Sequence, residues 1–188
     1  VLTLMGQLAI RRAHVVGHGL GGLVGYELLE TGPDLVASLT TTGTLVARES
    51  VRPRVQAALG MGRLSAMAGL NGLLASAGRC SRAVAATVRE MNFAVAHPTW
   101  DLLGWNLARY DYLGTLERHD VPMMIIRAGQ DRRVNAFMEP TLRKAAMKRN
   151  FWLADLEQAD HFVNLEQPSA FNHAVGWFLD DAPTAKAS

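Results

Sequence analysis

Cysteine is almost absent from this chain of 188 residues, because Cys80 is the only one. A single thiol excludes an internal disulfide, which is typical of a reducing compartment, so we expect a cytoplasmic location. With one cysteine, and with no histidines at the spacing of metal ligands, we expect no metal site. The chain also lacks a run of about 20 apolar residues, the length that spans a bilayer. The nearest candidate, Leu64–Gly78, is too short.

An excess of charge of either sign is lacking as well. The chain has 19 basic and 17 acidic residues, which give a formal net charge of +2, and no basic run is longer than the pairs Arg11-Arg12 and Arg132-Arg133. Proteins that bind nucleic acid or anionic membranes gather positive charge on one face, so we expect neither partner. Hydrophobic residues, in contrast, make up 49% of the chain, enough for the core of one globular domain.

The first part of the chain predicts a strand, a helix and a second strand. Ala13–Val16 is a short apolar run that stops at Gly17, which is typical of a buried strand. Apolar residues at helical spacing begin at Leu20, and Gly32-Pro33 ends that helix. Leu35–Thr42 is rich in Val, Leu and Thr and predicts the second strand. This order favours a parallel crossover.

The same pattern returns in the last third of the chain. One strand is predicted from the apolar run Val121–Ile126 and ends at Ala128-Gly129, and another is predicted at Phe151–Leu156, with a helix over Val134–Arg149 between them. A last helix begins near Pro168, because proline is favoured in the first helical turn. Its apolar face contains Phe171, Ala174, Val175, Phe178 and Leu179. The sequence therefore predicts an α/β fold, a mostly parallel sheet flanked by helices.

Residues 47–116 differ in composition from both flanking parts. They are rich in Ala, Gly, Leu and Met, and Val84, Val88 and Met91 recur at helical intervals. A segment of about 70 residues is far longer than an ordinary loop. We therefore expect a helical lid over 47–116 and an α/β core formed by 1–46 and 117–188.

Chemistry is indicated first at the turn after the first strand, where residues 17–22 read Gly-His-Gly-Leu-Gly-Gly. This turn resembles the strand–turn–helix elbow of the α/β-hydrolase family, Gly-x-Ser-x-Gly, in which the serine attacks the substrate carbonyl. Gly19 occupies the nucleophile position. Since glycine has no side chain, the resemblance implies a hydrolase scaffold without its nucleophile.

Two later segments carry the same resemblance. Ile125–Asp131 is similar to the family's strand followed by Gly-x-Asp, and Ala159–Pro168 is similar to its histidine loop and final helix. The order nucleophile, acid, histidine implies that Asp131 orients the base and that His161 is the base. All three positions follow parallel strands, whose carboxyl ends meet at one sheet edge.

The resemblance also implies the surroundings of the reaction. The backbone N–H of Leu20 would be one oxyanion donor, and a second donor would come from a loop upstream of Val1. We therefore expect the chain to be a fragment that supplies the last four strands of the family's sheet. His18, Trp100 and Trp105 are expected to line the substrate pocket, and no cofactor is implied. The elbow strand would lie at an open sheet edge, which favours self-association.

The resemblance therefore implies an esterase- or lipase-like hydrolase for a small ester, thioester or amide with an apolar acyl group, impaired at Gly19. In a related triad the loss of the nucleophile costs on the order of 10⁶ in rate. Three explanations that would allow hydrolysis stay open. Asp131 and His161 activate a water directly, His18 substitutes for the serine, or Gly19 is an altered position in an active hydrolase.

Two further classes of protein stay open as alternatives. The first is a non-catalytic member of the fold that binds a small apolar ligand under the lid. The second is an NAD(P)-binding oxidoreductase, because Gly17-x-Gly19-x-x-Gly22 also fits the dinucleotide-binding fingerprint. That fingerprint requires an acid at the end of the next strand, and Thr42-Gly43 stands there instead.

Overall fold

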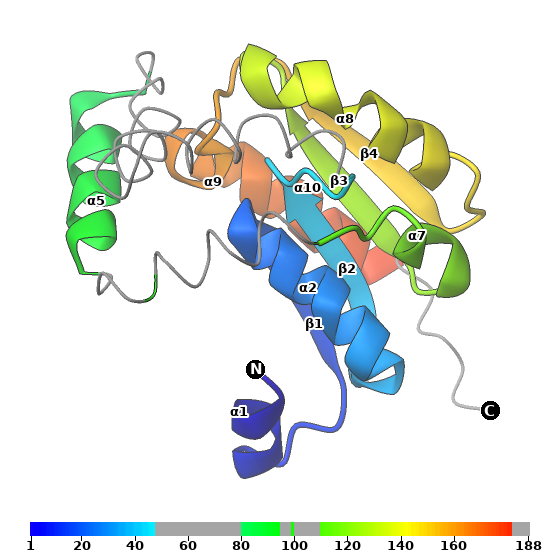
Figure 1. The fold of residues 1–188 in the computed structure, drawn as a ribbon. Helices are drawn as coiled ribbons and strands as arrows, with labels where there is room; N and C mark the ends of the chain where they lie inside the picture. Colours follow the sequence, from blue (N-terminus) through cyan, green and yellow to red (C-terminus); the bar gives the residue numbers. More distant parts are fainter. Residues whose placement is uncertain (48–79, 95–98, 100–109, 182–188) are drawn as a thin grey trace.

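Four parallel strands form one sheet in the part of the chain that the computed structural model describes, residues 1–47, 80–94, 99 and 110–181. They are β1 (Ala13–His18), β2 (Val36–Thr42), β3 (Met123–Ala128) and β4 (Phe151–Leu156), and they lie in this order across the sheet. Each neighbouring pair is parallel, so the carboxyl ends of the strands lie at one edge (Figure 1). The predicted α/β fold with a parallel sheet is confirmed.

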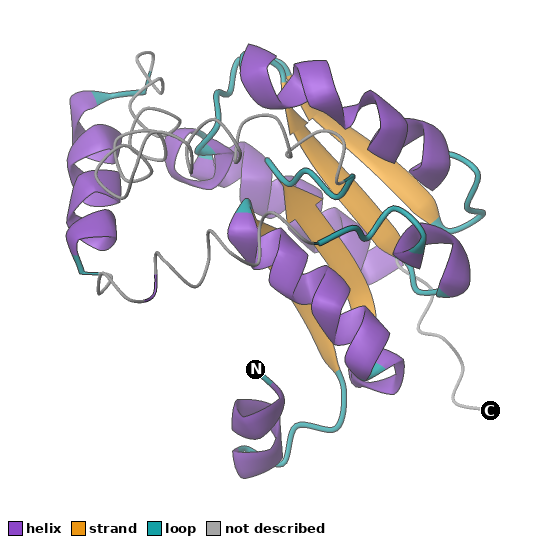
Figure 2. Cartoon of the chain, viewed as in Figure 1, coloured by secondary structure: helices purple, strands orange, loops and turns teal. Residues whose placement is uncertain are grey.

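Helices cover both faces of this sheet. Helix α2 (Leu20–Thr31) packs on β1 and β2, and α8 (Arg132–Ala145) lies on the same face. Helix α10 (Pro168–Asp181) covers the opposite face behind β3 and β4, and Figure 2 shows the sheet between the two helical layers. The shorter helices are α1 (Leu2–Gln7), the 3-10 helix η1 (Pro33–Leu35), α5 (Arg82–Phe93), α7 (Thr115–Arg118) and α9 (Val163–Glu166).

The alternation of side chains along β3 explains the two packed layers. Successive residues of a strand point to opposite faces, and Met123 and Ile125 join the core cluster shared with α2 and α8. Met124 and Ile126 point the other way and pack against Phe178 of α10. Since β3 is buried on both faces, its sequence is a continuous apolar run and not an alternating one.

The predicted strands are confirmed, with differences at their ends. β4 has the predicted bounds. β1 continues two residues beyond the prediction, to His18. β3 begins two residues after Val121 and ends at Ala128, as predicted. β2 begins at Val36, because Pro33–Leu35 first forms a 3-10 helix whose fixed proline φ favours a turn.

The predicted helices are confirmed at α2 and α10 and are corrected at α8. α10 begins at Pro168, and its predicted apolar face packs on the sheet. The bounds predicted for α8, Val134–Arg149, are wrong at both ends. The helix begins at Arg132, because the Asp131 side chain accepts the backbone N–H of Val134 at 3.1 Å and caps the first turn.

The predicted lid, residues 47–116, falls largely outside the described residues, and so do Trp100 and Trp105. Within it α5 is helical, as its periodicity predicts. Val84 and Val88 of α5 are buried against Phe162, whereas Met91 is 62% exposed. Near the end of the segment, Leu116 packs into the core cluster under α2. The extent and the covering role of the lid remain predictions.

The elbow strand β1 lies at one edge of the described sheet. Its Val16 is 46% exposed, and Leu4 of α1 and Leu8, which directly follows α1, are both more than half exposed. Among the described helices, none combines the length and the apolar character needed to cross a bilayer.

Glycines of the elbow differ in how closely they are packed, and this gives a first prediction. A Cβ at Gly17 would lie 2.5 Å from the backbone of Gly21, whereas a Cβ at Gly21 would meet no described atom within 4 Å. We expect Gly17→Ala to lower the free energy of unfolding by about 1–3 kcal/mol, as overpacking does. We expect Gly21→Ala to raise it by up to about 1 kcal/mol through helix propensity. Urea unfolding measures both, and equal losses would contradict this packing.

Candidate active site

Gly19 forms the turn between β1 and α2. Its φ of 54° and ψ of −115° lie in a region that residues with a Cβ rarely adopt. Two hydrogen bonds fix this turn to the end of β2 and the loop after it. The Gly19 N–H donates to the Thr42 carbonyl at 2.9 Å, and the Thr44 hydroxyl donates to the Gly19 carbonyl at 3.0 Å. The predicted nucleophile position therefore has the backbone of a sharp elbow.

Asp131 follows β3 and contacts His161 directly. Oδ2 of Asp131 lies 2.7 Å from Nδ1 of His161, and Oδ1 accepts the Val134 N–H. Burial of Asp131, which is 5% exposed, raises the pKa of its carboxyl. The hydrogen bond and charge of His161, with the Val134 N–H, outweigh burial and hold that pKa below its ordinary value. The pair is therefore built around an ionised carboxylate.

The loop between β4 and α9 carries His161, and hydrogen bonds from its backbone N–H groups to nearby carboxylates hold it in place. The His161 N–H donates to the Asp160 carboxylate at 2.8 Å, and the Asp160 N–H donates to Oε2 of Glu166 at 2.7 Å. The ring of Phe162 packs edge-on against His161, with 5.0 Å between the centroids. Phe162 also contacts the buried face of α5, so that helix lies next to the histidine loop.

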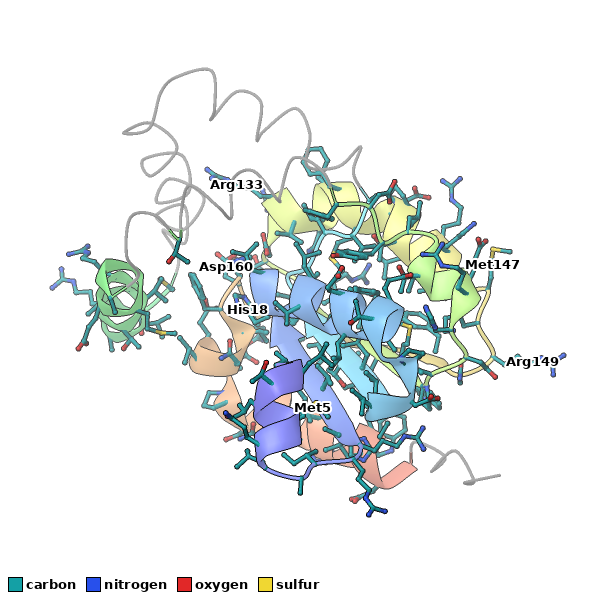
Figure 3. All side chains as sticks on the ribbon, turned by 60° about the horizontal axis from the view of Figure 1, so that its bottom comes forward. Met5, His18, Arg133, Met147, Arg149 and Asp160 are labelled. Carbon is teal, nitrogen blue, oxygen red and sulfur yellow. The ribbon has the colours of Figure 1, made fainter. Side chains whose placement is uncertain are left out.

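His18 contacts the same loop from β1. Its Nε2–H donates to the backbone carbonyl of His161 at 2.8 Å, and the two rings lie 4.8 Å apart in a T-shaped arrangement. Burial, with the nearby His161, lowers the pKa of His18 to about 4. Figure 3 shows His18 beside Asp160 at the end of the sheet near α5. The structure thus places His18, predicted to line the substrate pocket, against the backbone of the histidine loop.

Gly43 is a site residue that sequence reasoning missed. Its φ is 60°, and a Cβ there would lie 3.1 Å from Cε1 of His161 and 3.3 Å from Nε2 of His18. Any larger residue would push the two rings away. The signal was available, since a glycine directly after a predicted parallel strand lies at the edge where binding residues gather.

The structure brings four of the predicted positions to one edge of the sheet. Gly19 follows β1, Leu20 begins α2, Asp131 follows β3, and His161 lies in the loop after β4. The backbone N–H of Leu20 has no carbonyl four residues back within its helix, so it is a suitable donor to an anion. Among the described residues, no group of three His, Cys, Asp or Glu side chains is placed to hold a metal ion.

This geometry agrees with the comparison to known proteins. Residues 1–174 match the model of the Alpha/beta hydrolase family. The chain therefore belongs to the α/β-hydrolase family, as its three motifs predict.

Solved structures and one curated relative extend this result. A hydrolase from Pseudomonas aeruginosa PA01 is 27% identical, with a TM-score of 0.74 over 95% of this chain and 68% of that one. The enol-lactonase from Burkholderia xenovorans LB400 is 22% identical, with a TM-score of 0.76 over 96% and 70% of the two chains, and shows the shared fold. "Putative carbamate hydrolase RutD" of Pseudomonas savastanoi pv. phaseolicola (strain 1448A / Race 6) is 50% identical over 38 residues, 20% of this chain and 15% of that relative.

Asp131, which is buried, and His18, which is partly buried, predict how stability depends on pH at and below neutrality. The unfolded chain protonates His18 near its ordinary pKa of 6.5, whereas the folded chain does so only near pH 4. Its contribution to stability is therefore complete above pH 6.5 and is lost as the pH falls through about 4. Asp131, whose folded pKa is lowered, loses its contribution only below its unfolded pKa, roughly 3.9.

We therefore expect the free energy of unfolding, measured in urea, to fall between pH 6.5 and 4 and to fall further below pH 4. His18→Gln removes the first decrease and keeps the second. If the free energy of unfolding of that variant still fell between pH 6.5 and 4, the decrease would belong to a titratable group other than His18.

Proposed function

We propose that this chain has the active-site scaffold of an ester hydrolase of its family, in which the acid–base pair is kept and the serine-dependent step is lost. The observation that carries the proposal is the 2.7 Å contact between the buried Asp131 carboxylate and His161 at the elbow. A buried carboxylate that orients an imidazole stabilises the imidazolium formed when the base takes a proton.

Each residue has a role in this proposal. Asp131 orients His161, and Nε2 of His161 takes and returns the proton. The Leu20 N–H donates to the developing oxyanion, where preorganised donors lower the barrier most effectively. Gly19 holds the position from which a serine would attack. His18, Trp100 and Trp105 are proposed to contact the substrate.

The proposed substrates are small esters, with thioesters and amides as related acyl compounds. The names of the structural and curated relatives include an enol-lactonase and a carbamate hydrolase, and both reactions attack an acyl carbonyl. The apolar cluster of Val84, Val88 and Phe162 lies next to the histidine loop. It supports an apolar acyl group in the substrate.

Labelling with a fluorophosphonate tests the scaffold independently of turnover, because this reagent modifies an activated serine. We expect no label on the wild-type chain, a stoichiometric label on Gly19→Ser, and a strongly slowed label on Gly19→Ser with His161→Gln. Mass spectrometry of the intact protein and of its peptides reads the result. A folded Gly19→Ser chain that takes no label would refute the proposed function.

Binding without catalysis is a second candidate, favoured by the missing side chain at Gly19. The same apolar cluster beside α5 would then hold a small apolar ligand. Saturable binding of a fluorescent acyl probe, together with an inactive Gly19→Ser variant, would support this candidate over the hydrolase.

Association through the β1 edge is also proposed. Within the described residues, β1 has a hydrogen-bonded neighbour on one side only, and Val16 is 46% exposed. Unpaired strand edges with apolar side chains favour pairing between chains. We expect sedimentation velocity to show association that grows with concentration and that Val16→Lys weakens. A wild-type chain that stays monomeric at every concentration would contradict this.

A further inference from the structure

We infer that the Asp131–His161 pair acts as a general base on an external nucleophile, water in hydrolysis, held in the space that Gly19 leaves open. The inference rests on the proposed function and names the nucleophile of the proposed reaction. Under it the wild-type chain hydrolyses an ester in one chemical stage, and no acyl group becomes attached to the protein.

The hydrogen bonds of the two imidazoles assign the base. Nδ1 of His161 faces a carboxylate oxygen at 2.7 Å, so it carries the hydrogen and the lone pair of the neutral ring is on Nε2. Nε2 of His18 faces a carbonyl oxygen at 2.8 Å, so in that ring Nε2 carries the hydrogen and is occupied as a donor. Of the two rings at the elbow, His161 therefore supplies the basic nitrogen.

The space for the nucleophile lies beside this base. A Cβ at Gly19 would meet no described atom within 4 Å. The His161 ring lies against Gly43, which directly follows Thr42, and the Thr42 carbonyl accepts the Gly19 N–H at 2.9 Å. Gly43, which lies under the His161 ring, and Thr42, which is hydrogen-bonded to the turn at Gly19, are therefore consecutive residues. A bound water needs polar partners, and Nε2 of His161 provides an acceptor for its proton.

The chemical steps balance without a protein nucleophile. The water oxygen forms a bond to the acyl carbon while Nε2 of His161 takes one water proton. The carbonyl oxygen becomes an oxyanion and accepts from the Leu20 N–H. The tetrahedral intermediate then breaks its bond to the leaving oxygen, which takes the proton from the His161 imidazolium. The products are the carboxylic acid and the alcohol, and one water is consumed.

Water attacking directly limits the substrates. General-base assistance contributes about 10²–10⁴ in rate, less than a serine that attacks and is then regenerated. The leaving group must therefore depart easily. We expect the wild-type chain to prefer aryl and enol esters, enol-lactones included, over alkyl esters and amides.

Hydrolysis of nitrophenyl acetate by matched variants tests this inference. We expect the wild-type chain to show a slow steady rate with no burst, no acetyl adduct in the intact mass, and no inhibition by fluorophosphonate. His161→Gln should lower that rate by at least about 10². Gly19→Ala, whose methyl group occupies the place of the water, should lower it by about 10² through displacement of the nucleophile. Circular dichroism checks that each variant is folded. If Gly19→Ala does not fold, the rate of His161→Gln still decides the test.

The outcomes separate the inference from the proposed function. If Gly19→Ser is active and the wild-type rate equals that of His161→Gln, the inference is overturned and the proposed function stands. An acetyl adduct on the wild-type chain also overturns it, because another side chain then attacks. If neither the wild-type chain nor Gly19→Ser is active, the proposed function itself is refuted.

Discussion

Replacing Gly19 with serine is expected to raise kcat for nitrophenyl esters by about 10³ to 10⁶. The hydroxyl would stand at the elbow beside a histidine already oriented by a buried carboxylate, with 2.7 Å between Nδ1 and Oδ2. It would add a nucleophile attached to the protein, whereas water must be bound and oriented anew in each turnover. The upper limit is the loss seen when the serine of a related triad is removed.

The same substitution is expected to lower stability. Gly19 has a φ of 54°, and a side chain there costs on the order of 1–3 kcal/mol in backbone strain. No described atom lies within 4 Å of the added Cβ, so strain and not a clash is the cost. Gly19→Ala is the matched control, because it introduces the same strain without a hydroxyl. Thermal unfolding should show equal losses in both variants, and only serine should gain activity. A folded Gly19→Ser with no gain would contradict the prediction.

The meeting of Asp131 and His161 could be predicted because it depends on local signals. Each residue follows a short apolar run that reads as a parallel strand, and such strands end at one edge. The contact of His18 with the His161 carbonyl could not be predicted in the same way. It joins residues 143 positions apart, and its hydrogen bond depends on the path of a loop that has no periodicity. Gly43 was missed although it directly follows a predicted strand, and the folded loop adds that two imidazole rings lie against it.

The fold was predictable where the apolar period was unambiguous. β4 and α10 have the expected positions, because apolar residues recur along each of them at a regular spacing and pack into one layer of the core. The end of α8 was not predictable, because residues that favour helices, Ala146 to Arg149, continue past Ala145 without a glycine. Tertiary contacts end the helix instead. Nζ of Lys148 donates to the His119 carbonyl at 2.6 Å, and the Asn150 carbonyl accepts the Met123 N–H at 2.9 Å as the chain enters β4.

Asp131 performs two tasks, and substitutions at this residue should separate them. Oδ1 caps α8 through the Val134 N–H, and Oδ2 orients His161. In a Gly19→Ser background, Asp131→Asn keeps an oxygen for the cap. Its amide group, however, donates to Nδ1 and moves the ring hydrogen to Nε2. The base then has no lone pair for the serine, and we expect kcat to fall by about 10⁴, as the same change does in another triad.

Asp131→Ala in the same background is the matched variant. It loses the orienting group and the cap together, so kcat should fall to a similar level. Its free energy of unfolding should lie about 1 kcal/mol below that of the Asn variant, the usual contribution of an N-cap. Steady-state kinetics and urea unfolding of the three chains measure both effects. If Asn and Ala were equally stable, the Val134 hydrogen bond would not cap α8. If Asn kept full activity, the carboxylate would not set the ring hydrogen of His161, and the base would have to act without Asp131.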